Sequence, residues 1–403
     1  MEGKTVMLVG AGRHQRGAIL RAKALGLRVV AVDRNPEAAG LAEADVAEVV
    51  DFKDVDRVIE VARRHRIDGA LTISADRAVP VVAAVAEALG LPGIGTGTAH
   101  VMTNKIAMRR LLAEEGVPQP RFAAARTLLE ARGAADTVGF PAVLKPADSG
   151  GQRGIFLLDS IHDLDAHLHA ALAESAGGEV ILERYHDGLE LNGLVVTREG
   201  SAFPLTLSDR LRPPGIGFGV GWIHVYPATI FGVTLEEAER VAVRAVHALG
   251  LRNGIAFPQL LVVDGEVLVI EVAARIPGGQ MADLARHAVG VDLVEVALRQ
   301  ALGQPVPDEL CRPRFSQPLA IRFLTAAPGP LPTGRVQSVG PLDKVLAFPG
   351  VVQADVYLQA GETIRPVRLD GDRRGYVIAV AGTNLEALGR AEAAARLVDV
   401  VVE

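Results

Sequence analysis

Cysteine is almost absent from this 403-residue chain. Cys311 is the only one, so neither an internal disulfide nor a multi-thiolate metal site can form. Positive charge is in deficit, and the net charge of −6 argues against nucleic-acid or anionic-membrane partners, because both favour basic surfaces. No run approaches the roughly 18 consecutive apolar residues that a membrane span requires. These absences predict a cytoplasmic protein with no nucleic-acid and no membrane partner.

The first 100 residues alternate short apolar runs with helical segments. Such alternation is typical of a parallel sheet covered by helices, so we expect an α/β domain with a Rossmann-like sheet over residues 1–100. Strands are predicted at 6–9, 28–32 and 70–73, and helices at 17–25, 55–65 and 79–89.

The first turn of this domain leaves two interpretations open. The sequence GAGRHQRG at 10–17, with Asp33 after the second strand, resembles a dinucleotide-binding turn, but its last glycine comes too late for that motif. The alternative is a tight turn before a helix whose N-terminus holds another anion. The hypothesis that the protein is a nicotinamide-dependent dehydrogenase is therefore supported by this turn alone.

Beyond residue 100 the strand-like segments become longer and the helices fewer. One helix is expected near 99–115, ending at Gly116 before two prolines, and another at about 281–302. The proline-rich stretch 305–318 indicates a linker to a small C-terminal α+β domain.

The segment from Gly254 to Gly279 carries the most information. Two apolar runs flank Asp264–Gly265, which is a strong hairpin signal. Strand alternation places Gln259 and Glu271 where they can meet across the ladder, close to Arg275. A carboxylate and a cation at the open end of a β-ribbon suit a magnesium–phosphate site better than a core.

A lysine followed by a glycine loop forms a second candidate site. Lys145 ends an apolar strand and precedes ADSGGQRG at 147–154. Loop glycines let backbone N–H groups approach phosphate oxygens, and a lysine on the strand neutralises the adjacent charge. The alternative is an ordinary hairpin turn with a surface lysine.

Glu183 and Glu190 flank another strand end, where a carboxylate can accept a hydrogen bond from an adenine amino group or a ribose hydroxyl.

Four segments in this order resemble the ATP-grasp superfamily: NKIAMRRLLAEEGVPQP, FPAVLKPADSGGQRGI, VILERYHDGLELN and GIAFPQLLVVDGEVLVIEVAARIPGG. The resemblance covers nearly the whole chain. It implies a multidomain α/β and α+β fold, with a pre-ATP-grasp domain at 1–100 and an ATP-grasp domain at 101–312. A mobile lid is expected at about 122–184 and a C-terminal α+β domain at 313–403.

The resemblance also implies roles for individual residues. Lys105 and Lys145 match the lysines that contact the phosphates of ATP, and Arg275 matches the arginine that stabilises the phosphorylated intermediate. The hinge around Glu183 matches the adenine site. The remaining implied ligands are Ser149, Gly150, Gly151 and Gly154 in the lid loop, Arg184 and Tyr185 in the hinge, Glu190 for ribose, and Glu271 for Mg²⁺.

Two positions depart from the superfamily pattern. Gln259 lies where a first metal-binding glutamate is usual, and Ala273 lies where an asparagine is common. Gln259 can ligate Mg²⁺ through its carbonyl oxygen without adding charge, which leaves open whether one or two ions bind. The sequence EVAARIPGG is closer to the corresponding motif of L-amino-acid ligases than to that of the carboxylases.

The resemblance implies an ATP-dependent carboxylate–amine ligase that forms an amide through an acyl phosphate, acting on an amino acid or small carboxylic acid. Alternatives are a bicarbonate-using carboxylase or carbamoyl-phosphate-type enzyme, and a catalytically impaired ATP-binding protein. A homodimer is the default expectation. The candidate substrate contacts are Asp76, Asp209, Arg210, His224, Gly278 and Gly279. The long stretch 213–227, which contains Trp222, is expected to shape the acceptor pocket.

Overall fold

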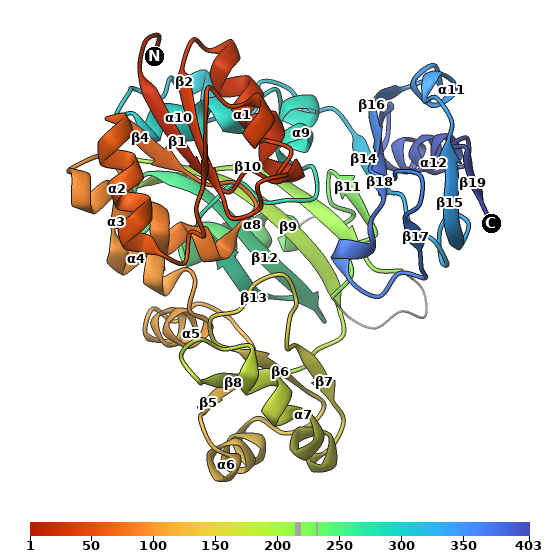
Figure 1. The fold of residues 1–403 in the computed structure, drawn as a ribbon. Helices are drawn as coiled ribbons and strands as arrows, with labels where there is room; N and C mark the ends of the chain where they lie inside the picture. Colours follow the sequence, from red (N-terminus) through yellow and green to blue (C-terminus); the bar gives the residue numbers. More distant parts are fainter. Residues whose placement is uncertain (214–218, 231–232) are drawn as a thin grey trace.

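Four β-sheets organise the chain in a computed structural model that describes residues 1–403 apart from 214–218 and 231–232 (Figure 1). The mixed multidomain fold confirms the expected class. Within the described residues, no helix has the length and apolar character needed to cross a membrane.

The N-terminal part contains the predicted parallel sheet. Its strands lie in the order β3 (Val46–Val49), β2 (Arg28–Asp33), β1 (Thr5–Val9) and β4 (Gly69–Leu71). Helices α1 (Arg13–Ala24), α2 (Val55–His65), α3 (Val79–Leu89) and α4 (Thr96–Val101) accompany the sheet. Because parallel strands end at one edge, the turns after β1 and β4 face the same cleft.

Residues 122–184 form a separate antiparallel unit, which projects at the bottom of Figure 1. Its strands lie in the order β5 (Phe122–Ala125), β8 (Val180–Arg184), β6 (Ala142–Pro146) and β7 (Phe156–Leu158). Helices α6 (Leu128–Val138) and α7 (Ile161–Ala173) pack on it over a core of its own. This is the range that the sequence assigns to the lid.

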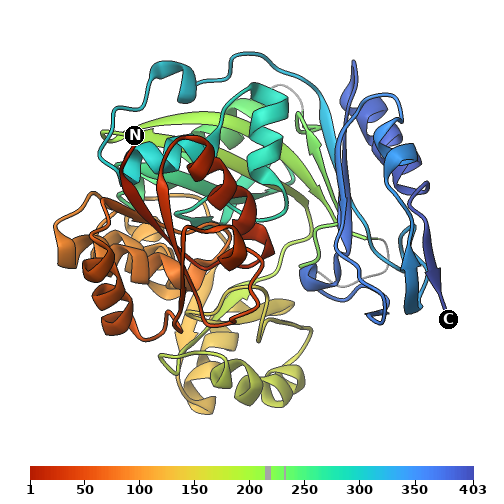
Figure 2. The same ribbon diagram turned by 45° about the horizontal axis from the view of Figure 1, so that its top comes forward.

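An eight-stranded sheet occupies the centre of the molecule (Figure 2). Its order is β13 (Glu266–Ala273), β12 (Gly254–Val263), β9 (Leu189–Arg198), β10 (Ser201–Leu211), β11 (Ile223–Tyr226), β14 (Leu319–Phe323), β18 (Gly375–Val380) and β16 (Val351–Val356). Helix α8 (Val233–Ala248) packs on it. Because β11 pairs with β14, the sheet continues across the proposed domain boundary at residue 312.

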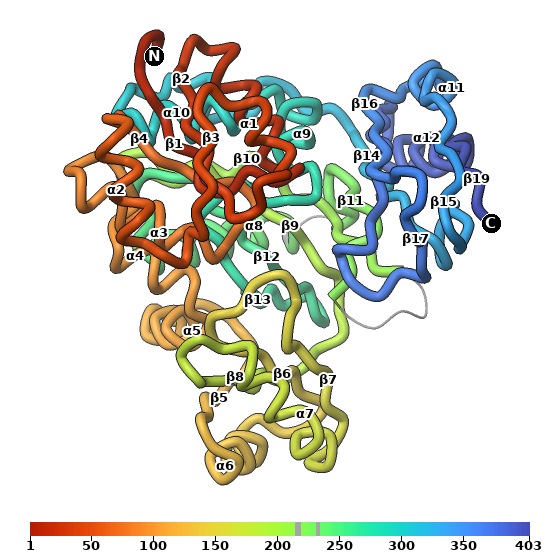
Figure 3. Tube along the Cα trace, in the orientation of Figure 1, coloured from red at the N-terminus to blue at the C-terminus, as the bar shows by residue number. Residues whose placement is uncertain are grey.

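The C-terminal part adds a small three-stranded sheet beside this central one, drawn in blue in Figure 3. Its strands are β17 (Thr363–Ile364), β15 (Gly334–Val339) and β19 (Val400–Val402). Helices α11 (Asp343–Leu346) and α12 (Asn384–Ala395) complete the α+β unit.

Two helices predicted as continuous are broken. The first separates into α4 and α5 (Lys105–Glu114), because the side chain of Asn104 accepts the Ala107 N–H at 3.0 Å and starts a new helix. The second prediction covers α9 (Met281–Leu284), a π-helical turn (Ala285–Val289) and α10 (Leu293–Ala301). Gly290, with φ of 76°, ends that turn, and the side chain of Asp292 caps α10.

Candidate active site

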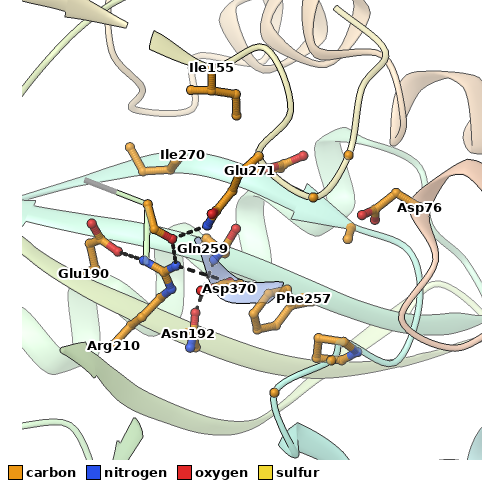
Figure 4. Close-up of a pocket in the computed structure, with 18 of the residues that line it drawn as sticks. Asp76, Ile155, Glu190, Asn192, Arg210, Phe257, Gln259, Ile270, Glu271 and Asp370 are labelled. Carbon is orange, nitrogen blue, oxygen red and sulfur yellow. Dashed lines mark hydrogen bonds and ion pairs between the residues drawn. The ribbon is translucent and has the colours of Figure 1, made fainter. Parts of the chain in front are cut away.

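A cavity of about 570 Å³ lies where the N-terminal part, the lid and the central sheet meet, and the C-terminal part closes one end. Figure 4 shows part of its lining. Most site residues predicted from the sequence line this cavity: Asp76, Lys105, Lys145, Ser149, Gly150, Gly151, Glu183, Arg184, Tyr185, Glu190, Arg210, His224, Gln259, Glu271, Arg275, Gly278 and Gly279. Two other predicted site residues, Gly154 and Asp209, are not part of the lining.

Lys105 joins the lid loop to the hairpin. The start of α5 at Asn104 places Lys105 in the first turn, where its N–H donates to the Ala147 carbonyl at 2.7 Å. Its Nζ donates to the Ser149 carbonyl at 2.7 Å and lies 3.6 Å from Glu271 Oε1. A single buried ammonium therefore contacts both the glycine loop and the candidate metal carboxylate.

Glu183 is held between two cations inside the hinge. Its Oε1 accepts from Arg109 Nε at 2.8 Å and its Oε2 from Lys145 Nζ at 2.6 Å. Burial would raise the pKa of Glu183, but the charges of Arg109 and Lys145 outweigh it and lower the pKa to about 2. Glu183 therefore stays ionised and orients Lys145.

This pairing adds a role for Glu183 beside the adenine contact that the resemblance implies. Each carboxylate oxygen keeps a second lone pair, so its contact with an adenine amino group or a ribose hydroxyl stays a prediction. Arg109 was not among the residues predicted from the sequence. It is fully buried and also donates to the carbonyls of Val269 and Ile270, each at 2.6 Å. A basic residue on the buried face of a predicted helix was the available signal.

The hairpin has the predicted register. Asp264 and Gly265 turn with φ of 50° and 81°, and Gln259 lies directly opposite Glu271. Gln259 Nε2 also donates to the Asn192 Oδ1 at 3.4 Å, which adds a second amide to this end of the cavity (Figure 4).

The oxygen donors at this end fit a magnesium ion bound together with phosphates. Mg²⁺ prefers hard oxygen ligands, and Glu271, Gln259 and Asn192 supply one carboxylate and two amide oxygens. In the described ranges no cluster of three His, Cys, Asp or Glu side chains is arranged to hold a metal. A Mg²⁺ ion held here would take its remaining ligands from phosphate oxygens and water.

Arg275 makes a bidentate pair with Asp76 from the N-terminal part. The Nε and Nη2 atoms of Arg275 donate to the two Asp76 carboxylate oxygens at 2.6 and 2.7 Å. Burial would raise the pKa of Asp76, but Arg275 reverses this and lowers it. Asp76 Oδ2 also lies 3.2 Å from the Cβ position of Gly150, so a side chain at Gly150 would crowd the carboxylate.

Glu190 lies in an ionic cluster with arginines of β10 and its continuation. It bonds to Arg210 and lies 3.4 Å from Arg212 Nε. Arg210 also lies 3.8 Å from Asp370 of the C-terminal part (Figure 4). The predicted ribose acid and the predicted substrate arginine are therefore partners in one cluster.

Local geometry explains why the predicted site residues Asp209 and Gly154 lie outside the lining. Successive residues of a strand face opposite sides, so Asp209 points away from the cavity that Arg210 lines. Both Asp209 oxygens accept from the Thr229 N–H, at 3.1 and 3.0 Å, and burial raises the pKa of Asp209. Gly154, with φ of 69°, lies against Pro146 and Glu174 at the base of the lid loop.

His224 lines the cavity, whereas Trp222 does not. Burial lowers the pKa of His224 far below its usual value, and the charges of Arg373 and Arg210 lower it further. Trp222 instead donates to Thr325 Oγ1 at 3.2 Å and is absent from the lining. Residues 214–218 of the predicted acceptor stretch lie outside the described residues.

Further lining residues come from the two ends of the chain. Arg13 and His14 follow the first glycine turn, and Tyr357 and Arg373 belong to the C-terminal part. The turn was recognised in the sequence as an anion site or a dinucleotide site. Asp33 holds this turn, because its carboxylate accepts from the N–H groups of residues 11 and 35 at 2.8 and 2.9 Å.

Three family models match consecutive parts of the chain. The ATP-grasp N-terminal domain matches residues 20–93, and the ATP-binding domain of the carbamoyl-phosphate synthase L chain matches residues 104–309. The L-amino acid ligase C-terminal domain 2 matches residues 323–403.

Relatives extend over the full length. The formate-dependent phosphoribosylglycinamide formyltransferases of Synechococcus sp. (strain CC9605) and Ignicoccus hospitalis are each 30% identical, covering 99% and 98% of this chain and 97% and 96% of theirs. Among solved structures, the L-amino acid ligase from Bacillus licheniformis has a TM-score of 0.85 at 21% identity, with complete coverage of both chains. The N5-carboxyaminoimidazole ribonucleotide synthetase from Thermotoga maritima has a TM-score of 0.75 at 21% identity, covering 99% of this chain and 100% of that one. The chain thus belongs to the ATP-grasp family of ADP-producing ligases that form carbon–nitrogen bonds.

Proposed function

We propose that this ATP-grasp ligase joins an amino acid or small carboxylic acid to an amine through an acyl-phosphate intermediate. One observation carries the proposal: Lys105 Nζ contacts the Ser149 carbonyl and lies 3.6 Å from Glu271. The lysine proposed to bind phosphate thus contacts the glycine loop and lies close to the carboxylate proposed to bind the metal, all within one cavity. The chemistry that needs all three is phosphoryl transfer.

The residues of the chain divide the task of holding ATP. Lys105, Lys145 and the N–H groups of Gly150 and Gly151 would bind phosphate oxygens, and Glu271 with Gln259 would hold one Mg²⁺. The hinge at 184–185 would bind the adenine through its backbone and Glu190 the ribose. The magnesium ion would neutralise charge on the transferred phosphoryl group, and a second ion has less support because Gln259 adds no charge.

The reaction then needs mainly positioning and electrostatics. A substrate carboxylate oxygen attacks the γ-phosphorus, and the bond to the β–γ bridging oxygen breaks to release ADP. Lys145 and Arg275 would stabilise the negative charge that is shared by the transferred group. The amine next attacks the acyl carbon, phosphate leaves with the bonding electron pair, and a proton is released. The lid excludes water that would hydrolyse the intermediate.

The substrate end of the site is the part near Asp76, Arg210, His224 and Gly278–Gly279. The names of the similar proteins support a carboxylate–amine reaction, because they include an L-amino acid ligase and formate-dependent formyltransferases that act on phosphoribosylglycinamide. His224 would act there as a neutral hydrogen-bonding group, since its pKa is well below the usual value. A homodimer remains our expectation for the assembly.

The test is phosphate release from Mg²⁺-ATP over a panel of amino acids and carboxylic acids, added singly and with amines. Release should require the correct acid, and Glu271→Gln should abolish it. The matched control is Glu266→Gln, at an exposed position on the same strand, which should leave the activity unchanged.

Other outcomes would contradict the proposal. Release with bicarbonate alone would favour a carboxylase or carbamoyl-phosphate-type reaction. Binding of ATP without release across the panel would indicate a catalytically impaired protein. Near-normal activity of Glu271→Gln would remove the metal assignment.

A further inference from the structure

A cluster of charged side chains leads from the carboxylate proposed to bind ribose to the C-terminal part. Glu190 of β9 bonds to Arg210 of β10, and Arg210 Nη2 lies 3.8 Å from Asp370 Oδ2 (Figure 4). Asp370 begins a short 3₁₀ turn (Asp370–Asp372) shortly before β18. The cluster therefore connects the nucleotide end of the cavity with a loop of the C-terminal part.

Asp370 is held in place by two other segments. Its Oδ1 accepts from the Gly221 N–H at 2.9 Å and from Arg373 Nη2 at 2.6 Å. Arg373 Nε in turn donates to the Gly221 carbonyl at 2.8 Å. With Oδ1 bonded in this way, Oδ2 is the oxygen that faces Arg210.

Gly221 lets two arginine side chains approach each other. A Cβ atom at this position would lie 2.6 Å from Arg373 Nη2 and 2.9 Å from Arg210 Nε, which is too close for a side-chain carbon. Two like charges at this separation need a counter-charge beside them. Burial lowers the pKa of Arg373 to about 10, and the charge of Asp370 opposes that decrease.

Arg210 is anchored at both ends of its guanidinium group. Nη1 donates to Glu190 Oε2, whereas Nη2 donates to the Gly219 carbonyl and faces Asp370. The group is planar, so it cannot rotate without losing one of these partners. The other oxygen of Glu190, Oε1, lies 3.4 Å from Arg212 Nε and keeps lone-pair capacity for a ligand in the cavity.

We propose that Asp370 is a positioning residue for the nucleotide: through Arg210, it holds the Glu190 carboxylate at the ribose hydroxyls. This inference rests on the proposed function, in which Glu190 binds the ribose. It gives the C-terminal part a share in nucleotide affinity. Arg210, predicted from the sequence as a substrate contact, then serves the nucleotide instead.

Nucleotide binding tests the inference without turnover. Isothermal titration calorimetry in the presence of Mg²⁺ compares ADP with 2′,3′-dideoxy-ADP, which lacks both ribose hydroxyls. The proteins are the wild type, Asp370→Asn and Arg210→Lys, which keeps the charge but loses the planar fork. The matched control is Asp343→Asn, the same change at an exposed position of the C-terminal part at the start of α11.

ADP should bind Asp370→Asn and Arg210→Lys about 10-fold more weakly than the wild type, because a displaced carboxylate loses its hydrogen bonds to the hydroxyls. Asp343→Asn should bind ADP like the wild type. The dideoxy nucleotide should bind all four proteins equally, since it lacks the groups that Glu190 receives. Unchanged ADP affinity in Asp370→Asn, or an equal loss for both nucleotides, would overturn the inference.

The outcomes also separate this inference from the ligase proposal. If no acid gives phosphate release, the proposed reaction fails, but the wild type should still prefer ADP to the dideoxy nucleotide, and Asp370→Asn should lose most of that preference. If the wild type binds both nucleotides equally, the ribose contact of Glu190 is absent and the role of Asp370 is refuted.

Discussion

Arg109 is expected to be the costliest single residue to remove from the hinge. Its side chain is 1% exposed and joins three elements: α5 itself, β8 through Glu183, and β13 through the carbonyls of Val269 and Ile270. Arg109→Met would leave Glu183 with Lys145 alone and two carbonyls without their donors. Breaking a buried ion pair from one side costs about 3–5 kcal/mol.

The lowered pKa of Glu183 gives this effect a pH dependence. Its pKa falls from 4.5 to about 2 in the folded protein, because Arg109 and Lys145 together outweigh the effect of burial. A carboxylate with a lowered folded pKa contributes stability above pH 4.5 and loses it as the pH falls toward 2. Arg109→Met raises the folded pKa of Glu183, so the deficit of the variant should shrink as the pH falls from 7 to 3.

Thermal unfolding of the full chain tests both statements. Arg109→Met should lower the midpoint at pH 7 by about 5 °C. Arg110→Met, at the exposed neighbour on α5, should unfold with the wild type. The reasoning would be refuted by equal midpoints for the two variants, or by a deficit that does not change with pH.

Three further predictions concern the cavity. Asp76→Asn should lower kcat/KM about 10- to 100-fold, because it releases Arg275. Asp209→Asn, at a carboxylate that faces away from the cavity, should leave kcat/KM unchanged. Phosphate release measures both variants, and equal losses would contradict the geometry. Gln259→Glu should tighten the apparent Mg²⁺ dissociation constant about 10-fold in a titration of activity, and an unchanged value would exclude Gln259 from the metal site. Below pH 6.5 unfolded His224 gains a proton that the folded form resists, so stability present above this pH is lost as the pH falls. His224→Gln should reduce that pH dependence, and an unaltered profile would argue against a buried neutral histidine.

The local pattern of the chain already contained most elements of the fold. The helices at 55–65 and 79–89 have the predicted bounds, because apolar periodicity and stop signals are properties of short segments. The interruption before Lys105 was not predicted. An Asn within a helical pattern looks the same in the sequence whether its side chain caps a new helix, as Asn104 does, or points to solvent.

The hairpin illustrates how much of the site the amino-acid order specifies. Alternation and the Asp264–Gly265 turn fix which residues oppose each other, and so Gln259 meets Glu271 as expected. The order of the four motifs was sufficient to predict the family. The roles of individual site residues, apart from these contacts, stay predictions.

Tertiary packing determined which charges became partners. Arg109 lies 74 positions from Glu183, and Asp76 lies 199 positions from Arg275, so no periodicity links them. Arg13 and Tyr357 meet only because the N-terminal and C-terminal parts close the same end of the cavity. Local sequence sets the direction of each side chain within its own element. The pairing of buried charges depends on which elements pack together, since each buried charge must find its counter-charge across that interface.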